Sequence, residues 1–168
     1  EEVLSHYARH HKTGEVMPAD LVAKIKRAAN FQAGMNGLAQ IRLGMLDLAW
    51  HAKDISSVKT PDDVSDFETK ALARFKLIEG PKSEVSPSFL HIFSGGYSSG
   101  YYSYKWADVL AADAFDAFQE AGVFNPEIAK RFREEVLEKG GSENAAVIYK
   151  RFRGADPDTD ALLRCEGL

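Results

Sequence analysis

Helix start and stop signals recur along this sequence, whereas no strand-like alternation of apolar and polar residues persists for more than a few positions. The strongest start signal is Thr60-Pro61-Asp62-Asp63. It combines a threonine N-cap, a proline at the first helical position and two acids in the first turn. The pattern predicts an all-α chain that folds as a multi-helix bundle.

The same signals place the individual helices. Helices are expected over 3–12, from about 18 to 29, from about 31 to 53, from 61 to about 75, from about 97 to 121, from Asn125-Pro126 to Gly140-Gly141, from a Ser142 cap onward, and in a short last stretch from Asp156-Pro157. Turn residues at 80–83 and 86–88 mark the longest loop. This loop leads into the segment that begins at His91.

Length and composition favour one helical domain over residues 1–168. At 168 residues and 45% hydrophobic content, the chain can bury a sizeable core without a disulfide or a metal. A net charge of −4 leaves no basic surplus for a phosphate backbone, so nucleic acid is not an expected partner. No apolar run approaches the roughly 18 residues of a membrane span, and the lone Cys165 fits a reducing compartment. We therefore expect a cytoplasmic protein with no membrane partner.

Residues 91–106 hold four of the six tyrosines, one of the two tryptophans and a glycine-rich turn. A helix that begins near Tyr97 would place Tyr97, Tyr101 and Tyr104 within an arc of about 60°. The opposite face would then be a core stripe of Tyr102, Trp106, Val109 and Leu110. Because a buried phenol needs a hydrogen-bond partner, three aligned phenols away from the core favour a cleft for polar substrate atoms. The alternative is a tyrosine-rich helix interface whose hydroxyls reach water.

Three other features allow a catalytic interpretation. The run 96–100 matches a G-x-S-x-G nucleophile elbow, but all five histidines precede Ser98 and no parallel sheet is expected, which favours a simple turn. His6 and His10 have the i, i+4 spacing of a zinc-peptidase helix, but Tyr7 stands where the general base would be. That favours a solvated helix face over a metal site. His91, six residues before Tyr97, has either a functional or a structural role.

The segment from His91 to Leu110 resembles, almost residue for residue, the signature of the thimet oligopeptidase and oligopeptidase A family of zinc metallopeptidases. The match continues through Asp113-Ala114-Phe115 and is closest to the bacterial oligopeptidase A branch. Further similarities span nearly the whole chain and lie at 10–15, at 30–34, at Asp47 with His51, and at 150–154 with Pro157.

The resemblance implies a substrate channel lined by His91, Tyr97, Tyr101 and Tyr104. His91, Tyr97 and Tyr104 would act in catalysis by hydrogen-bonding the scissile peptide and its oxyanion, and Tyr101 would bind substrate. Preorganised phenol donors aimed at a developing negative charge stabilise it by about a few kcal/mol each. The implied roles therefore agree with the chemistry expected from the tyrosines themselves.

The resemblance also implies that Gly95 and Gly96 form a hinge loop at the substrate site. The family holds its zinc with an H-E-x-x-H helix and a later Glu, and neither is identifiable in this sequence. The chain is therefore expected to be the C-terminal helical lobe of a larger metallopeptidase, with the zinc-binding part upstream and no metal of its own. The parent enzyme would be a zinc-dependent oligopeptidase that hydrolyses short peptides, and this chain alone would be inactive.

The alternative function is a non-catalytic helical module that uses the tyrosine face to hold a peptide or a partner helix. Since the lobe that would roof the channel is expected upstream, the face of Tyr97, Tyr101 and Tyr104 is expected to be open to solvent, and exposed aromatic surface of this kind favours self-association. An H-E-x-x-H motif upstream in the same reading frame would decide for the enzyme.

Overall fold

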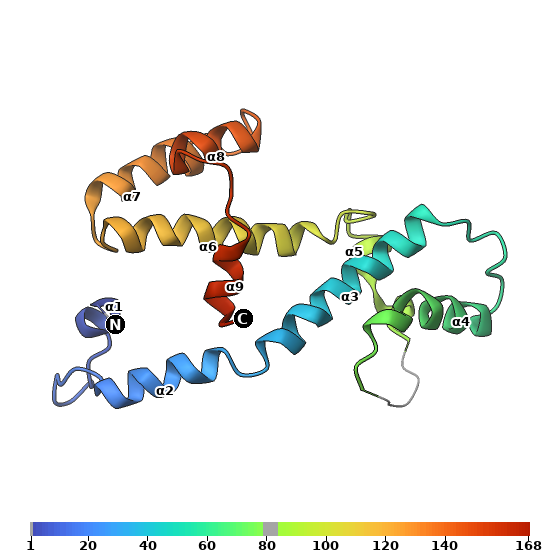
Figure 1. Cartoon of the computed structure of the whole chain (residues 1–168), viewed down its shortest axis with the longest axis horizontal. Coiled ribbons are helices and arrows are strands. Elements are labelled where there is room, and N and C mark those ends of the chain that lie inside the picture. Colours follow the sequence, from blue (N-terminus) through green and yellow to red (C-terminus); the bar gives the residue numbers. More distant parts are fainter. Residues whose placement is uncertain (1, 79–83) are drawn as a thin grey trace. The chain divides into compact units, whose positions relative to one another are not determined.

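A computed structural model describes residues 2–78 and 84–168 of the chain (Figure 1). Within these ranges the regular structure is helical, apart from one isolated antiparallel bridge between Arg9 and Val16, so the all-α prediction is confirmed. The chain divides into two compact units, a terminal unit of residues 2–33 and 108–168 and a central unit of residues 34–107. Folding as one domain stays a prediction. The loop predicted at 80–83 lies outside the described residues.

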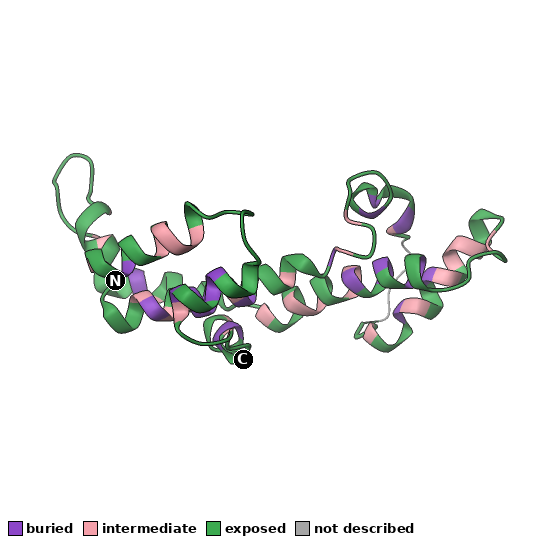
Figure 2. Cartoon of the chain, turned by 90° about the horizontal axis from the view of Figure 1, so that it is seen from above, coloured by how far each residue is buried: buried purple, intermediate pink, exposed green. Residues whose placement is uncertain are grey.

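The central unit is built on two helices, α3 (Ala33–Ala52) and α4 (Pro61–Leu72). Short 3₁₀ turns at Ala73–Phe75 and Ser86–Ser88 follow, and then α5 (Leu90–Phe93) and the first turns of α6 (Ser103–Ala121). Figure 2 colours the buried residues, and those of the central core are Leu46, Trp50, Leu72, Phe89, Ile92 and Tyr101.

The start of α4 lies where the sequence predicts it. Thr60 Oγ1 accepts a hydrogen bond from the Asp63 N–H at 3.2 Å, and the Asp63 carboxylate accepts one from the Thr60 N–H at 2.8 Å. This reciprocal capping satisfies N–H groups that a helix start otherwise leaves free. Backbone and side-chain donors of Lys59 and Thr60 also lower the pKa of Asp63, because they favour its charged form.

A buried carboxylate joins α4 to the segment that leads into α5. Glu68, which is 5% exposed, accepts hydrogen bonds from the Val85 N–H at 2.8 Å, the Ser86 N–H at 3.0 Å and the Ser86 hydroxyl at 2.7 Å. Ser86 Oγ in turn accepts from the indole N–H of Trp50 at 2.9 Å. Because these buried polar groups are all partnered, they fix the path of the chain into α5.

The terminal unit contains α1 (Glu2–Tyr7), α2 (Ala19–Ala29), most of α6, α7 (Pro126–Phe132), α8 (Ala145–Arg153) and α9 (Asp160–Glu166). α7 continues as a π-helical turn over Arg133–Leu137. The core between α6, α7 and α8 is made of Ala114, Ala117, Ile128, Tyr149 and Phe152. A second cluster joins α6 to α9 through Val109, Ala112, Ala161 and Leu162.

Asp113 of α6 is the buried acid of the terminal unit, at 2% exposure. Its Oδ2 accepts from the Tyr149 hydroxyl at 2.6 Å and its Oδ1 from Arg153 Nε at 3.1 Å. Arg153 also donates to Glu120 at 3.0 Å. Burial, followed by the hydrogen bond to Asp113, raises the pKa of Tyr149, so the phenol keeps the proton that it donates.

α1 is shorter than predicted, because the helix expected over 3–12 ends at Tyr7. The chain from 8 to 17 folds back on itself instead, and the His10 N–H donates to the Glu15 carbonyl at 2.9 Å. Gly14 stands at φ +74°, a left-handed conformation that glycine adopts readily and that reverses the chain. The Thr13-Gly14 signal therefore belongs to a turn rather than to the end of a longer helix.

Two later helices begin downstream of their predicted starts. α8 follows Asn144, whose side chain accepts from the N–H two residues later at 2.9 Å, rather than Ser142. α9 begins at Asp160, whose N–H donates to Asp158 at 3.0 Å, rather than at Asp156-Pro157. The Asn144 side chain thus caps α8, whereas the N-cap of α9, Thr159, makes no capping hydrogen bond with its side chain. None of the helices in the described ranges is both long and apolar enough to cross a membrane.

Candidate functional site

A tight turn with two glycines follows α5. The N–H groups of Ser94 and Gly95 both donate to the Leu90 carbonyl, at 2.8 and 2.9 Å. A Cβ on Gly95 would lie 2.9 Å from the His91 carbonyl oxygen and 3.0 Å from the His91 Cα, so the backbone would have to shift. Gly96 stands at φ +82°, where other residues are strained. The sequence thus folds the chain tightly past His91, while the predicted hinge role of the glycines stays a prediction.

The tyrosine helix begins later than predicted. A start near Tyr97 is wrong, since α6 begins at Ser103. Ser99 stands at φ +57°, which a right-handed helix does not allow. The cause is Asp47 of α3, whose carboxylate accepts hydrogen bonds from the N–H groups of Ser99 and Tyr101, both at 2.9 Å. These two N–H groups are therefore not available to continue α6 toward its N-terminus.

The predicted site residues nevertheless come together. We call His91, Tyr97, Tyr101 and Tyr104 the tyrosine–histidine cluster. The ring centroid of His91 lies 6.2 Å from that of Tyr97, 5.9 Å from Tyr101 and 6.4 Å from Tyr104. The Tyr104 ring stacks on Tyr97 and is tilted against Tyr101, with centroids 5.2 Å apart in both pairs. The structure brings all four residues into one group, and their catalytic roles stay predictions.

The cluster has a buried side and an open side. Tyr101 is 9% exposed and packs edge-on against Phe89, and its hydroxyl donates to Gln40 Oε1 at 3.1 Å. Tyr104 is 41% exposed, Tyr97 is half-buried and His91 is exposed. The expectation that all three tyrosines form an open face is therefore wrong for Tyr101, because its ring is needed to fill the central core.

The phenols of the cluster are set up to donate protons in hydrogen bonds. Burial raises the pKa of Tyr101. The hydrogen bond with Tyr97, followed by burial and the neighbouring phenols, raises the pKa of Tyr104. A tyrosine is neutral near pH 7 with or without such a rise, so its O–H is a hydrogen-bond donor there. The open side thus presents phenol and imidazole groups that suit a carbonyl oxygen or an oxyanion.

The predicted core stripe opposite the tyrosines is only partly present. Tyr102 is 60% exposed and Trp106 is 47% exposed, so the prediction is wrong for both. Val109 is buried and Leu110 is half-buried, as expected. The stripe assumed a helix from Tyr97, and Tyr102 lies before the observed start of α6, whereas Trp106 lies within the helix and is exposed on it.

Asp47 is the residue of this region that sequence reasoning left without a role. It lies in the apolar run Leu46-Asp47-Leu48-Ala49-Trp50 of α3, and its side chain is fully buried. A lone acid inside an apolar stretch of helix indicates a buried carboxylate with hydrogen-bond partners. That signal is visible in the sequence, but the partners, 52 and 54 residues away, are not.

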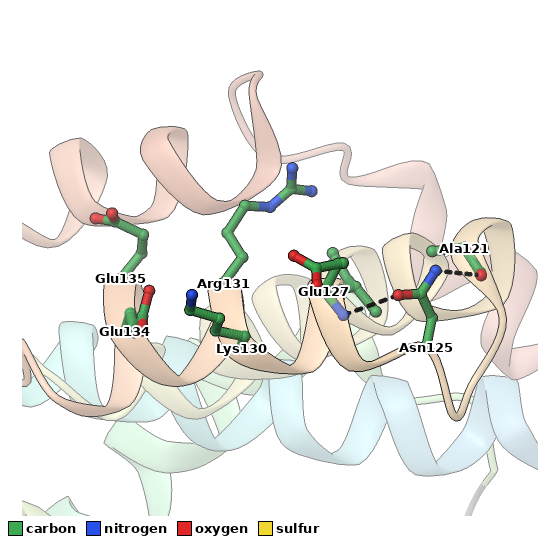
Figure 3. Close-up of a pocket in the computed structure, with 8 residues that line it drawn as sticks. Ala121, Asn125, Glu127, Lys130, Arg131, Glu134 and Glu135 are labelled. Atoms are coloured by element: carbon green, nitrogen blue, oxygen red, sulfur yellow. Dashed lines mark hydrogen bonds between the residues drawn. The ribbon is translucent and has the colours of Figure 1, made fainter.

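Two cavities bear on the choice of site. A groove of about 130 Å³ adjoins the cluster and is lined by Gln40, Ile41, Gly44, Met45, Leu48, Tyr101, Tyr102, Tyr104 and Lys105. A pocket of about 390 Å³ in the terminal unit, drawn in Figure 3, mixes acids with bases and is lined by Ala121, Asn125, Glu127, Ile128, Lys130, Arg131, Glu134 and Glu135. There Asn125 acts as the cap of α7, accepting from the Glu127 N–H at 2.9 Å. Larger cavities of about 580 and 840 Å³ lie beside α4, but the tyrosine–histidine cluster is the candidate site because it joins the four predicted side chains.

The remaining motifs assemble no catalytic site in the described part of the chain. Ser98 Oγ donates to the Ile92 carbonyl at 2.6 Å, and residues 2–78 and 84–168 form no parallel sheet that could carry a nucleophile elbow. His10 lies beyond the end of α1, where its Nδ1 accepts from the Thr13 N–H, so it shares no helix face with His6. Across the same ranges, no group of three or more His, Cys, Asp or Glu side chains could hold a metal ion. The described residues therefore do not fit a zinc site.

Comparison with known proteins finds relatives that match the chain along its whole length. Residues 1–168 match the family described as peptidase family M3. The chain is 42% identical to oligopeptidase A of Haemophilus influenzae, over 100% of this chain and 24% of that protein. It is 41% identical to oligopeptidase A of Escherichia coli and 36% identical to the probable cytosolic oligopeptidase A of Arabidopsis thaliana, in each case over 99% of this chain and 24% of the relative. The chain thus spans about a quarter of the length of these relatives.

Proposed function

This chain belongs to peptidase family M3, and from that premise we propose that it forms the substrate-binding and oxyanion-stabilising part of a zinc-dependent oligopeptidase that hydrolyses short peptides. The observation that carries the proposal is the meeting of His91, Tyr97, Tyr101 and Tyr104 in one group of rings with an open side. The names of the relatives, which are oligopeptidases, support the same activity.

Each member of the cluster has a proposed part in the reaction. Tyr104, at 41% exposure, donates its O–H to the oxyanion that forms when the scissile carbonyl is attacked. Tyr97, stacked on Tyr104, and His91 donate to the same oxygen or to the adjacent peptide group. Tyr101 forms the floor against which the substrate lies, since its hydroxyl is already engaged with Gln40.

The Gly95-Gly96 turn is proposed to be the hinge of the site. Gly96 occupies a left-handed conformation, φ +82°, and has open space where a side chain would be. Glycine changes backbone conformation with little steric cost. Movement at this position would shift His91 relative to Tyr97 and open the cluster to a peptide.

The proposed zinc ion would be bound by residues of the whole protein outside those described. We propose that its zinc is held elsewhere, that the 168-residue chain alone is inactive, and that the protein is cytoplasmic, as the name of one relative suggests for that relative. Zinc content after dialysis and hydrolysis of a quenched fluorogenic peptide test the chain directly. One tightly held zinc per chain, with turnover that a chelator abolishes, would contradict this part of the proposal.

The decisive experiment replaces Tyr104 by Phe in the whole protein. Deletion of one oxygen removes an interaction made chiefly in the transition state, so kcat should fall by about 10²–10³ while KM changes little. The matched control is Tyr7→Phe, which removes the same atom from a ring of α1 that is 75% exposed and lies outside the cluster and its groove, and should leave kcat unchanged. An unchanged kcat with a raised KM in Tyr104→Phe would instead make Tyr104 a residue that binds the substrate before the reaction rather than one that stabilises the oxyanion.

A further inference from the structure

Asp47 holds the backbone of the segment that carries the tyrosines. Its side chain is fully buried, and its two oxygens are divided between two N–H groups. Oδ1 accepts from Ser99 and Oδ2 from Tyr101, both at 2.9 Å. One carboxylate on α3 thus spans the residue between them and sets the conformation of the chain immediately before α6.

His51, one helical turn after Asp47, completes the environment of the carboxylate. His51 Nδ1 lies 2.8 Å from Asp47 Oδ1 and 2.9 Å from the Asp47 carbonyl oxygen. Both oxygens can only accept a hydrogen bond, so Nδ1 carries a proton and donates. The imidazole is partly exposed, at 23%, and its ring also contacts Phe93. The buried carboxylate therefore has three donors, which fix its orientation.

The two hydrogen bonds from the backbone to Asp47 can affect the position of Tyr104 through a few intervening residues. The Tyr101 carbonyl accepts from the Tyr104 N–H at 3.2 Å, so the position of Tyr101 sets that of the residue three places on. Ser99, held at φ +57°, is in a conformation that a residue with a side chain rarely adopts unless other contacts impose it. Asp47 supplies that contact through the Ser99 N–H.

We propose that Asp47, oriented by His51, is a positioning residue for the peptidase reaction. It keeps the Tyr104 hydroxyl where the oxyanion forms, without contact with the substrate. The inference rests on the proposed function of the cluster, and it adds two residues that act on the reaction through the backbone. Displacement of a catalytic group by about 1 Å can cost about 10² in rate.

The test uses Asp47→Asn in the whole protein. Asparagine keeps the size of the side chain but replaces one accepting oxygen by an NH₂ group, which would face a backbone N–H. We expect kcat to fall by about 10- to 100-fold with a much smaller change in KM. Asp113→Asn is the matched control, because it makes the same change at a buried aspartate of the terminal unit and should leave kcat unaltered.

A double-mutant cycle separates positioning from a general structural effect. If Asp47 acts through the Tyr104 hydroxyl, Asp47→Asn should lower kcat little further once Tyr104→Phe has removed that hydroxyl. Losses that multiply would overturn the inference. If Tyr104→Phe lowers kcat and Asp47→Asn does not, the inference alone fails. If Tyr104→Phe has no effect on kcat, the proposed function of the cluster fails.

Amide hydrogen exchange provides a readout that does not depend on activity. The amides of Ser99 and Tyr101 should exchange at least about tenfold faster in Asp47→Asn than in the parent, because their acceptor is altered. Unchanged exchange at both amides would overturn the inference. If Asp47→Asn does not fold, His51→Ala replaces it, since its partly exposed side chain can be removed with less disturbance. It should then give faster exchange at Ser99 and a smaller fall in kcat, and failure to change either would also overturn the inference.

Discussion

Each compact unit contains a buried aspartate on a long helix, and the two differ in what they bind. Asp113 of α6 is 2% exposed and accepts from two side chains of α8, the Tyr149 hydroxyl and the Arg153 guanidinium. Asp47 of α3 is fully buried and accepts from two backbone N–H groups of the irregular segment before α6. Both residues are buried aspartates, but their hydrogen-bond partners give them different structural roles.

The partners of Asp113 lie on a helix that has its own backbone hydrogen bonds. The network of Asp113, Tyr149 and Arg153 therefore fixes how α8 packs on α6, and its loss should appear as lost stability. The partners of Asp47 lie in a segment of single turns before α6, where the Ser99 and Tyr101 N–H groups donate to this carboxylate rather than to the backbone, so we expect the carboxylate to help set the conformation of that segment. Its loss should appear first in the geometry of the tyrosine–histidine cluster.

Asp113→Ala is expected to have the largest effect on stability, and it tests the contrast between the two aspartates. The substitution leaves Arg153 and the Tyr149 hydroxyl without their buried acceptor and should lower the free energy of unfolding by about 3 kcal/mol. Urea denaturation would measure it, with Asp156→Ala as control, since that carboxylate is 81% exposed and pairs with Lys150 at the surface. kcat of the whole protein should not change, and a large fall in kcat would break the distinction between the two aspartates.

A smaller effect is expected from Thr60→Ala, which destabilises the central unit away from the cluster. Removal of the N-cap hydroxyl of α4 should lower the free energy of unfolding by about 1 kcal/mol, and Thr60→Ser should restore most of it. A thermal melt and steady-state kinetics on both variants check this. If kcat falls in proportion to the loss of stability, any destabilisation of the central unit disturbs the cluster. That result would contradict a specific positioning role for Asp47.

The sequence predicts the elements whose signals are local. The start of α4 follows from four consecutive residues at 60–63, and Thr60 caps the helix as the pattern predicts. The all-α class follows in the same way from the repeated start and stop signals. The exact starts of α8 and α9 are less predictable, because neighbouring residues such as Ser142 and Asn144 compete to cap the same helix.

The tyrosine segment shows why the rest could not be predicted. Helical spacing of Tyr97, Tyr101 and Tyr104 predicts one face, and the rings do meet, but on a backbone that is not helical before Ser103. The backbone there is set by Asp47, more than 50 residues earlier in the chain. A contact between residues so far apart in the sequence cannot be predicted from the local pattern. The exposure of Tyr102 and the burial of Tyr101 therefore could not be predicted.

The central claim is that the tyrosine–histidine cluster stabilises the oxyanion of peptide hydrolysis, and a crystal structure of the whole protein with a phosphinic peptide tests it most directly. The tetrahedral phosphinyl group mimics the geometry and charge of the transition state. We expect one phosphinyl oxygen to lie about 2.7–3.1 Å from the Tyr104 hydroxyl, with a second hydrogen bond from Tyr97 or His91. A bound analogue whose phosphinyl oxygens are all beyond hydrogen-bond distance of these three side chains would contradict the claim.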